Sequence, residues 1–218
     1  MWRARLFAIL HRPEPGNRLA RWVNYVLIAL IVAIAGDSGA VYGVRALEAL
    51  KRMGTLEIPL IVSRSATKAL STETGLTPAK LARLADVVHD AADPGPPLFA
   101  AGFETRGLLV TPCSAETLRM VADEDNTSLV AKAAEFCLKE QRRVALLVPE
   151  TTLDLATIQL MAKATRLGAV VVPPVPAFYH RPETLDDIVD QTVGRALDLF
   201  GIEAGLVRRW TEDDRRAP

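Results

Sequence analysis

The chain has 218 residues and half of them are hydrophobic, which allows one large domain with a sizeable core or two small domains. Lysine plus arginine and aspartate plus glutamate both number 26, and aromatic residues are only 6%, so neither charge nor aromatic content favours a nucleic-acid partner. The two cysteines and three histidines show no metal-ligand spacing, so we expect no metal site, and free thiols in a reducing cytoplasm.

Residues 1–25 form an N-terminal extension with five arginines among the first 22 residues, followed by an apolar run. The run is too short to span a bilayer, and no small-residue cleavage site follows it. Two interpretations stay open for this extension. It is either an amphipathic helix around Trp2, Leu6 and Leu10 that contacts a membrane surface, or an extended gene start without a function.

Strand and helix signals alternate through residues 26–205, which we interpret as one domain, followed by a charged tail at residues 206–218 that is solvated or acts as a contact arm. Strands are predicted at Leu30–Ala35, Ile58–Ser63, Val87–His89, Gly107–Pro112, Val144–Val148 and Ala169–Val172. Helices are predicted at Ala40–Met53, Ala66–Leu70, Pro78–Ala85, Ala115–Asp123, Leu129–Arg142 and Leu155–Leu167, the last with a core face of Leu155, Ile158 and Met161. This alternation predicts an α/β fold with a mainly parallel sheet, and the unbroken apolar runs fit strands that are covered on both faces.

The loop Gly36-Asp37-Ser38-Gly39 lies between the first strand and the first helix. In a doubly wound fold this position binds phosphate, because glycine lets the backbone approach and the helix N-terminus supplies N–H donors. A plain tight turn is the alternative. The carboxylate of Asp37 would repel a phosphate unless it points away.

Three further loops with polar side chains follow predicted strands. Ser63 is a ligand hydroxyl or only a loop start, and the hydroxyls of Ser114 and Thr117 bind a polar or anionic ligand or merely cap a helix. Glu150 is placed for general acid–base work, although an ordinary acid near a helix start is the plainer explanation. Ligands of open α/β sheets bind beyond the carboxyl ends of the strands, so the glycine loop, the Ser114 turn and the Glu150 loop together favour one site at that edge.

The segment Pro173-Pro-Val-Pro-Ala-Phe-Tyr-His-Arg-Pro182 follows the last strand. Its four prolines exclude strand ladder and helix, so we expect a stiff extended loop that presents Tyr179. Thr184 as N-cap, with Asp187 three residues later, predicts a helix that carries Arg195. The apolar stripe of this helix is Leu185, Ile188, Val189, Ala196 and Leu197. A tyrosine on a rigid loop and a lone arginine on the next helix indicate an anion-binding corner.

In order and spacing these blocks resemble the flavin prenyltransferases of the UbiX type from about Ile31 to about Gly205. The blocks are Gly36–Gly43, Val62–Ala66, Gly107–Leu118, Ala133–Glu140, Glu150–Thr151, Pro173–Pro182 and Arg195–Asp198. The resemblance implies a Rossmann-like, flavodoxin-type three-layer sandwich with bound FMN and no metal. It also implies transfer of a dimethylallyl group from dimethylallyl phosphate to reduced FMN, in a cytoplasmic homo-dodecamer with sites at subunit contacts. The prenylated FMN would serve a UbiD-type decarboxylase, as in ubiquinone or aromatic-acid metabolism.

The resemblance also assigns roles by position. Ser38 and Glu150 would be catalytic, with Glu150 moving protons. The residues implied to bind FMN are Gly36, Asp37, Ser38, Ser63, Ser114, Ala115, Glu116 and Thr117. The residues implied to hold the prenyl phosphate are Lys132, Lys139, Tyr179 and Arg195, since departure of an allylic phosphate needs cations or donors that stabilise the leaving anion.

The chain departs from the family pattern where a phosphate would lie. Asp37 stands where the family has alanine, Glu116 where it has lysine, and Lys132 and Pro149 where it has arginine, while Ala100-Ala-Gly102 replaces a serine-rich loop. Each charge-assisted hydrogen bond lost costs about 1.5–3 kcal/mol. A divergent FMN-binding oxidoreductase and a non-catalytic flavoprotein or scaffold subunit therefore stay open as alternatives. The related FMN-dependent cysteine decarboxylases are disfavoured, because no histidine occupies the matching place.

Overall fold

A computed structural model of the chain describes residues 28–92 and 103–209. The N-terminal extension, residues 93–99 and the segment Ala100–Gly102 lie outside the described residues, as does the tail beyond residue 209. Within the described ranges, no helix combines the length and the apolar character needed to cross a bilayer.

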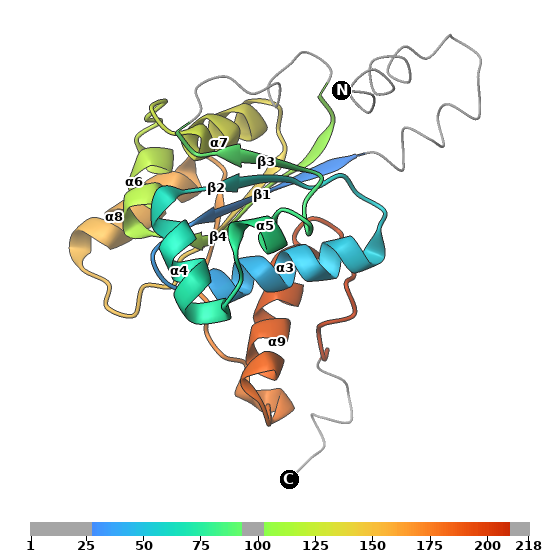
Figure 1. Cartoon of the computed structure of the whole chain (residues 1–218). Coiled ribbons are helices and arrows are strands. Elements are labelled where there is room, and N and C mark those ends of the chain that lie inside the picture. Colours follow the sequence, from blue (N-terminus) through green and yellow to red (C-terminus); the bar gives the residue numbers. More distant parts are fainter. Residues whose placement is uncertain (1–27, 93–102, 210–218) are drawn as a thin grey trace, which may run out of the picture.

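Six parallel strands form one sheet in the order β3-β2-β1-β4-β5-β6 (Figure 1). The strands are β1 (Ala29–Ala35), β2 (Pro59–Val62), β3 (Val87–Asp90), β4 (Thr105–Cys113), β5 (Arg143–Leu147) and β6 (Val170–Val172). The strand order reverses at β1, which pairs with β2 on one side and with β4 on the other. In open α/β sheets such a reversal opens a crevice at the carboxyl ends of the central strands.

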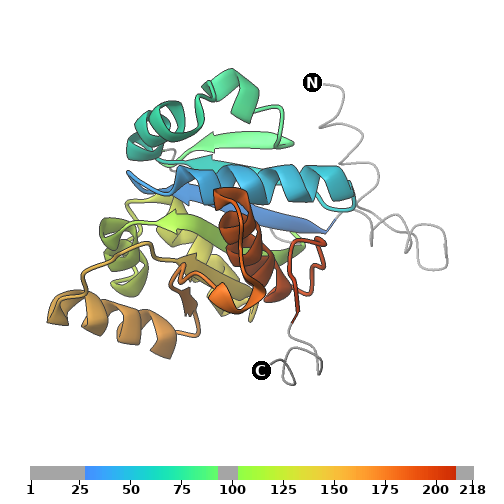
Figure 2. The same ribbon diagram turned by 90° about the horizontal axis from the view of Figure 1, so that it is seen from below.

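Helices cover both faces of this sheet and complete three layers (Figures 1 and 2). One face is packed by α3 (Ala40–Met53), α4 (Arg64–Thr74), α5 (Pro78–Leu81) and α9 (Leu185–Asp198). The other face is packed by α6 (Ala115–Ala122), α7 (Leu129–Lys139) and α8 (Leu155–Arg166). The predicted α/β three-layer sandwich with a parallel sheet is therefore confirmed. The central strand β1 is buried along its whole length, as its unbroken apolar run predicts.

Gly43 in α3 brings the first helix unusually close to the sheet. A methyl group at this position would lie 2.4 Å from the Thr111 carbonyl oxygen in β4 and 2.8 Å from Cγ1 of Ile34. Only a residue without a side chain fits there, so Gly43 sets how closely the start of α3 and the preceding glycine loop lie against the ends of β1 and β4.

Two predicted core faces are wrong in part. On α8, Leu155 is 70% exposed and Ile158 is also exposed, whereas the third predicted residue, Met161, is half-buried and packs on the core as expected. On α9 the first residue of the predicted stripe, Leu185, is 81% exposed, while Val189 and Leu197 are buried as expected. Periodicity identifies the apolar face of a helix, but it does not determine whether this chain or another covers that face.

The proline-rich segment also differs from the expected extended loop. Phe178–His180 forms one turn of 3₁₀ helix, η2, between Pro176 and Pro182. The turn is possible because none of these three residues is proline, and a single 3₁₀ turn needs only one backbone bond, from the N–H of Arg181 to the Phe178 carbonyl at 3.0 Å.

Candidate functional site

Backbone hydrogen bonds join the loops that follow β1, β2 and β4 at the carboxyl-end edge of the sheet. The N–H of Ser63 donates to the carbonyl of Ile34 at 3.0 Å, and the N–H of Ser114 donates to the carbonyl of Ala35 at 2.9 Å. Both acceptors lie at the end of β1, directly before Gly36. The structure thus brings together the glycine loop, Ser63 and the Ser114 turn, although 78 positions separate Gly36 from Ser114 in the numbering.

The glycine loop presents its polar side chains outward. Asp37 and Ser38 are exposed, whereas Gly36 is buried and packs on Pro112, whose Cγ would lie 3.0 Å from a methyl group added at Gly36. Gly39 adopts a left-handed conformation with φ of 83° immediately before α3, a conformation that glycine adopts at little cost. The two glycines therefore let this loop pack tightly against the end of β4.

A carboxylate that sequence reasoning missed lies at the same helix start. The N–H of Gly39 donates to Oε1 of Glu73 at 2.9 Å, and Glu73 comes from the last turn of α4. This acid satisfies one of the donors at the N-terminus of α3 that would otherwise be open to an anion. No local pattern around residue 73 indicates this contact, because it depends on how α4 packs beside α3.

The turn at the start of α6 is held by side-chain hydrogen bonds and also has backbone N–H groups without an acceptor in the helix. Oγ of Ser114 accepts from the N–H of Thr117 at 3.2 Å and lies 3.1 Å from Oγ1 of Thr117, which in turn donates to the Ala35 carbonyl at 3.1 Å. These two hydroxyls hold the turn against β1. The first N–H groups of α6, on Ala115 and Glu116, have no intrahelical acceptor, as at any helix start. Backbone donors of this turn are therefore its best ligands for an anion.

Ser63 caps α4 in the same manner. Its Oγ accepts from the N–H of Ala66 at 3.2 Å and lies 3.0 Å from Oγ of Ser65. The two interpretations of Ser63 are compatible, since a capping hydroxyl accepts from the backbone and keeps its own proton for another acceptor.

Glu150 lies beside the Ser114 turn. The side chain is exposed just beyond β5, and Cys113, the last residue of β4, is fully buried. Burial raises the pKa of the Cys113 thiol far above its ordinary value, and the negative charge of Glu150 raises it further. The thiol is therefore neutral. Because β5 pairs with β4, Glu150 follows a strand that ends beside the Ser114 turn, and an acid–base group at this edge could act on a bound ligand.

A hydrogen bond joins Tyr179 to α9, the helix that carries Arg195. The Tyr179 hydroxyl accepts from Nε2 of Gln191 at 2.9 Å, and Gln191 lies one helical turn before Arg195. Arg195 is exposed in the last turn of α9, and within the described residues its guanidinium forms no ion pair. The tyrosine is thus anchored to the helix that carries the exposed Arg195, and the anion-binding corner stays a prediction.

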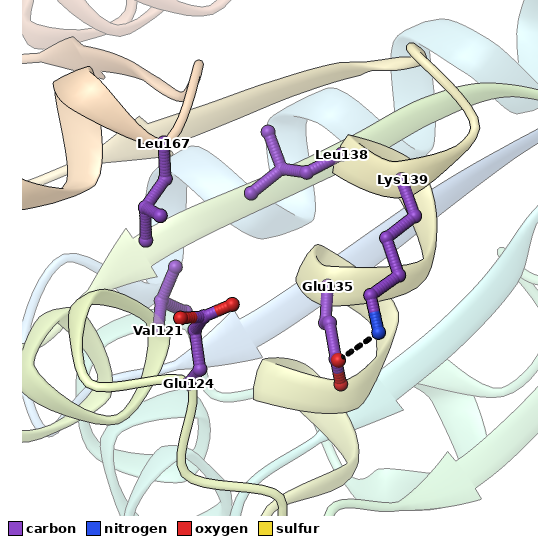
Figure 3. A pocket seen from close by; sticks show the side chains of 6 residues that line it. All are labelled: Val121, Glu124, Glu135, Leu138, Lys139 and Leu167. Atoms are coloured by element: carbon purple, nitrogen blue, oxygen red, sulfur yellow. Dashed lines mark hydrogen bonds and ion pairs between the residues drawn. The ribbon is translucent and has the colours of Figure 1, made fainter.

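Lys139 lies at the opposite edge of the sheet from these loops. It ends α7 just before β5 begins, and it pairs with Glu135 one turn earlier (Figure 3). Together with Val121, Glu124, Leu138 and Leu167 these residues line a pocket of about 200 Å³ between the ends of α6, α7 and α8. Within one chain Lys139 is therefore not brought to Tyr179 and Glu150.

Lys132 is closer to the candidate site than Lys139. It lies in the first turn of α7, which starts next to the end of β3 because the N–H of Leu129 donates to the Ala91 carbonyl at 2.9 Å. Lys132 is half-buried there, and Pro149 is half-buried at the end of β5. Gly102 lies outside the described residues.

The residues at the carboxyl-end edge fit the FMN that the resemblance implies. Gly36 and Gly39 let the glycine loop pack on Pro112 at the end of β4, and the start of α6 offers N–H donors to a phosphate. Hydroxyls on Ser38 and Ser63 add polar contacts. Within residues 28–92 and 103–209, no group of three or more histidine, cysteine, aspartate or glutamate side chains could hold a metal ion.

Comparisons with known proteins agree with this geometry. The family model described as Flavoprotein matches residues 23–197. Flavin prenyltransferase UbiX from Thauera aromatica is 44% identical over 187 residues, which covers 86% of this chain and 96% of that protein. The crystal structure of AnUbiX (PadA1) in complex with FMN and dimethylallyl pyrophosphate is 38% identical with a TM-score of 0.81, covering 84% of this chain and 97% of the other. A dodecameric FMN-dependent UbiX-like decarboxylase from Escherichia coli O157:H7 is 39% identical with the same TM-score, covering 84% and 100%.

Proposed function

The chain belongs to the Flavoprotein family and, within it, to the flavin prenyltransferases, and from this membership we propose that it transfers a dimethylallyl group from dimethylallyl phosphate to reduced FMN. One structural observation supports this most: the glycine loop, the start of α6 and Glu150 meet at one edge of the sheet. Since the related AnUbiX structure holds dimethylallyl pyrophosphate, either phosphate form of the donor is a candidate.

FMN binding rests on the loops after β1, β2 and β4. Backbone N–H groups of Ala115 and Glu116 would hold its phosphate, and Ser38 and Ser63 would add hydroxyl contacts. When bound in its reduced form, FMN supplies the electron-rich ring system that accepts the dimethylallyl carbon. The acidic Asp37, Glu73 and Glu116 make the rim less favourable to a phosphate than a basic rim would be.

Glu150 is the proposed proton-transfer residue. Its carboxyl group could donate a proton to the departing donor phosphate and, as a carboxylate, then take up the proton that the prenyl acceptor would lose. Glu150 is exposed just beyond β5, and its charge acts on Cys113, the residue before the turn at the start of α6. Ser38, exposed on the glycine loop, is the proposed second catalytic group, with a hydroxyl to orient the reacting ends.

Tyr179 and Arg195 are the proposed ligands of the prenyl phosphate. The guanidinium is suited to a bidentate bond with phosphate oxygens, and the phenol adds one donor. Their cation and donor stabilise the negative charge that grows as the carbon–oxygen bond breaks. Lys132 and Pro149 weaken this part of the site relative to two arginines, because lysine lacks the planar fork and proline lacks a donor.

We further propose that the active assembly is a homo-dodecamer in the cytoplasm, in which Lys139 of one copy completes the phosphate site of another. Two observations support the assembly: a 39% identical neighbour is dodecameric, and large apolar side chains stay exposed around the candidate site. They are Leu153, Leu155, Ile158, Val175, Phe178 and Leu185. Light scattering after size-exclusion chromatography is expected to give twelve times the 23.7 kDa chain mass, and Lys139→Ala in the intact oligomer is expected to raise KM for the donor.

The two buried free cysteines support the proposed location in the cytoplasm, which is a reducing compartment.

The decisive experiment is mass spectrometry of the small molecule released after anaerobic incubation with reduced FMN and dimethylallyl phosphate, and separately with the pyrophosphate. A mass equal to prenylated FMN is expected. Unmodified FMN would overturn the transferase in favour of an FMN-binding protein that has lost the donor site. Released product that activates a UbiD-type apo-decarboxylase would establish the proposed recipient, whereas an inactive decarboxylase would remove it.

A further inference from the structure

A short C-terminal segment, Leu206–Arg209, contacts the tyrosine that is proposed to bind the prenyl phosphate. The Tyr179 hydroxyl donates to the Arg208 carbonyl at 3.1 Å. Nη1 of Arg208 donates to the His180 carbonyl at 3.1 Å, so the same residue also holds the turn that carries Tyr179. These contacts join residues 28 or 29 positions apart in the chain.

Gln191 ties both partners to α9. Its Nε2 donates to the Tyr179 hydroxyl at 2.9 Å and to the Arg208 carbonyl at 3.3 Å, while its Oε1 accepts from the N–H of Arg208 at 3.0 Å. The Gln191 side chain is only 3% exposed. A buried amide that uses both its nitrogen and its oxygen in this way fixes the geometry of the groups it joins.

The C-terminal segment packs on α9 at Gly194, about one turn beyond Gln191. A methyl group at this position would lie 2.5 Å from Cγ2 of Val207 and 3.0 Å from Cβ of Leu206. The segment therefore packs directly on the helix backbone, and this close contact is independent of the hydrogen bonds at Gln191.

We propose that Gln191 and the C-terminal segment position Tyr179 for the prenyl phosphate, so that Gln191 acts on substrate binding through Tyr179 and not by touching the substrate. This inference rests on the proposed function, because it needs Tyr179 to be a phosphate ligand. It gives α9 two roles at the site: Arg195 offers the cation, and Gln191 places the phenol one turn away.

The hydrogen bonds also define how the phosphate engages Tyr179. A phenol has one proton, and in this structure that proton goes to the Arg208 carbonyl. A phosphate oxygen is a stronger acceptor than a neutral carbonyl, so the bound donor would take over this proton. Gln191 would still donate to the phenol oxygen and keep the ring in place, and the Arg208 carbonyl would retain its bond from Gln191.

The test compares Gln191→Met with the matched control Thr192→Val. Met keeps the size of the side chain but removes all three hydrogen bonds, whereas Thr192 is a buried neighbour whose hydroxyl bonds only its own helix, at the Ile188 carbonyl. Gln191→Met is expected to raise KM for dimethylallyl phosphate, and its Kd by calorimetry on FMN-loaded protein, about tenfold, with FMN affinity unchanged. Hydrogen exchange over Leu206–Arg209 is expected to accelerate. Thr192→Val is expected to change none of these.

A double-mutant cycle separates positioning from a general structural effect. In the Tyr179→Phe background, Gln191→Met is expected to alter KM less than twofold, because the group through which it acts is already gone. A tenfold change that persists in that background, or no change in the wild-type background, would overturn the inference.

A second variant covers the case in which Gln191→Met does not fold. Gly194→Ala favours the helix but displaces the C-terminal segment, so KM is expected to rise while thermal stability is largely kept. Adding Val207→Ala removes the closest contact and is expected to restore KM in part; unaffected KM in Gly194→Ala would count against the proposal. If wild-type protein makes no prenylated FMN, the proposed function fails, and calorimetry with dimethylallyl phosphate still tests the inference. Wild-type protein that does not bind the donor at all would overturn both.

Discussion

Thr117→Val tests whether the turn at the start of α6 is held in place by the end of β1. Thr117 is 5% exposed, and its hydroxyl donates to the Ala35 carbonyl at 3.1 Å while lying 3.1 Å from Oγ of Ser114. Valine keeps the shape and removes both bonds. The Ala35 carbonyl keeps its bond from the Ser114 N–H, so it is not left without a partner.

The expected loss in free energy of unfolding follows from the two hydrogen bonds that the substitution removes. Each neutral hydrogen bond contributes about 0.5–1.5 kcal/mol net, so the loss of two gives about 1–3 kcal/mol. For a chain of this size 1 kcal/mol corresponds to about 2–4 °C, so a fall in Tm of about 2–12 °C is expected. Because the same turn presents the N–H groups of Ala115 and Glu116, FMN binding is expected to weaken about three- to tenfold.

Thermal unfolding of flavin-free protein and fluorescence titration with FMN measure the two effects. Thr165→Val is the matched control, since its hydroxyl bonds the Met161 carbonyl at 2.8 Å on the exposed face of α8, far from the loops at the strand ends. That variant is expected to stay within about 0.5 kcal/mol of the wild type. Equal effects of the two substitutions, or unchanged FMN affinity in Thr117→Val, would refute the idea that this bond organises the site.

Three other measurements test separate parts of the argument. Gly43→Ala is expected to cost roughly 1–3 kcal/mol, read as a lower urea midpoint, because the new methyl would lie 2.4 Å from the Thr111 carbonyl; an unchanged midpoint would show that α3 moves away freely. Pro149→Arg is expected to tighten dimethylallyl phosphate binding about tenfold by calorimetry, and unchanged affinity would remove Pro149 from the phosphate site. Hydrogen bonds from Thr184, and next from the Glu183 N–H, hold the pKa of Asp187 below its ordinary 3.8. The resulting stabilisation is present above pH 3.8 and is lost as the pH falls through the lowered pKa. In Asp187→Asn the urea midpoint is therefore expected to depend less on pH in this range, and a pH profile identical to that of the wild type would contradict this reasoning.

Local signals in the sequence were sufficient for the strands and α-helices and their order, although not for the 3₁₀ turn at Phe178–His180. The helix at Ala40–Met53 has the predicted bounds, and the capping box of Thr184 and Asp187 forms as the spacing predicts, with both reciprocal bonds present. These features depend on residues within one or two turns of each other, so the chain determines them before it folds. The convergence of strand-end loops was also predictable, because parallel strands place their carboxyl ends at one edge.

Long-range packing decided which side chains meet at that edge. Glu73 reaches the Gly39 N–H across 34 positions, and the Tyr179 hydroxyl reaches the Arg208 carbonyl across 29; neither contact has a local pattern. The exposure of Leu155 could not be predicted from the sequence either, because an apolar stripe on a helix has the same pattern whether the same chain or another copy covers it. The sequence alone therefore determined the elements, their order and the type of each site residue. Only the tertiary structure determined their neighbours, because the neighbours of a side chain depend on how distant helices pack on the shared sheet.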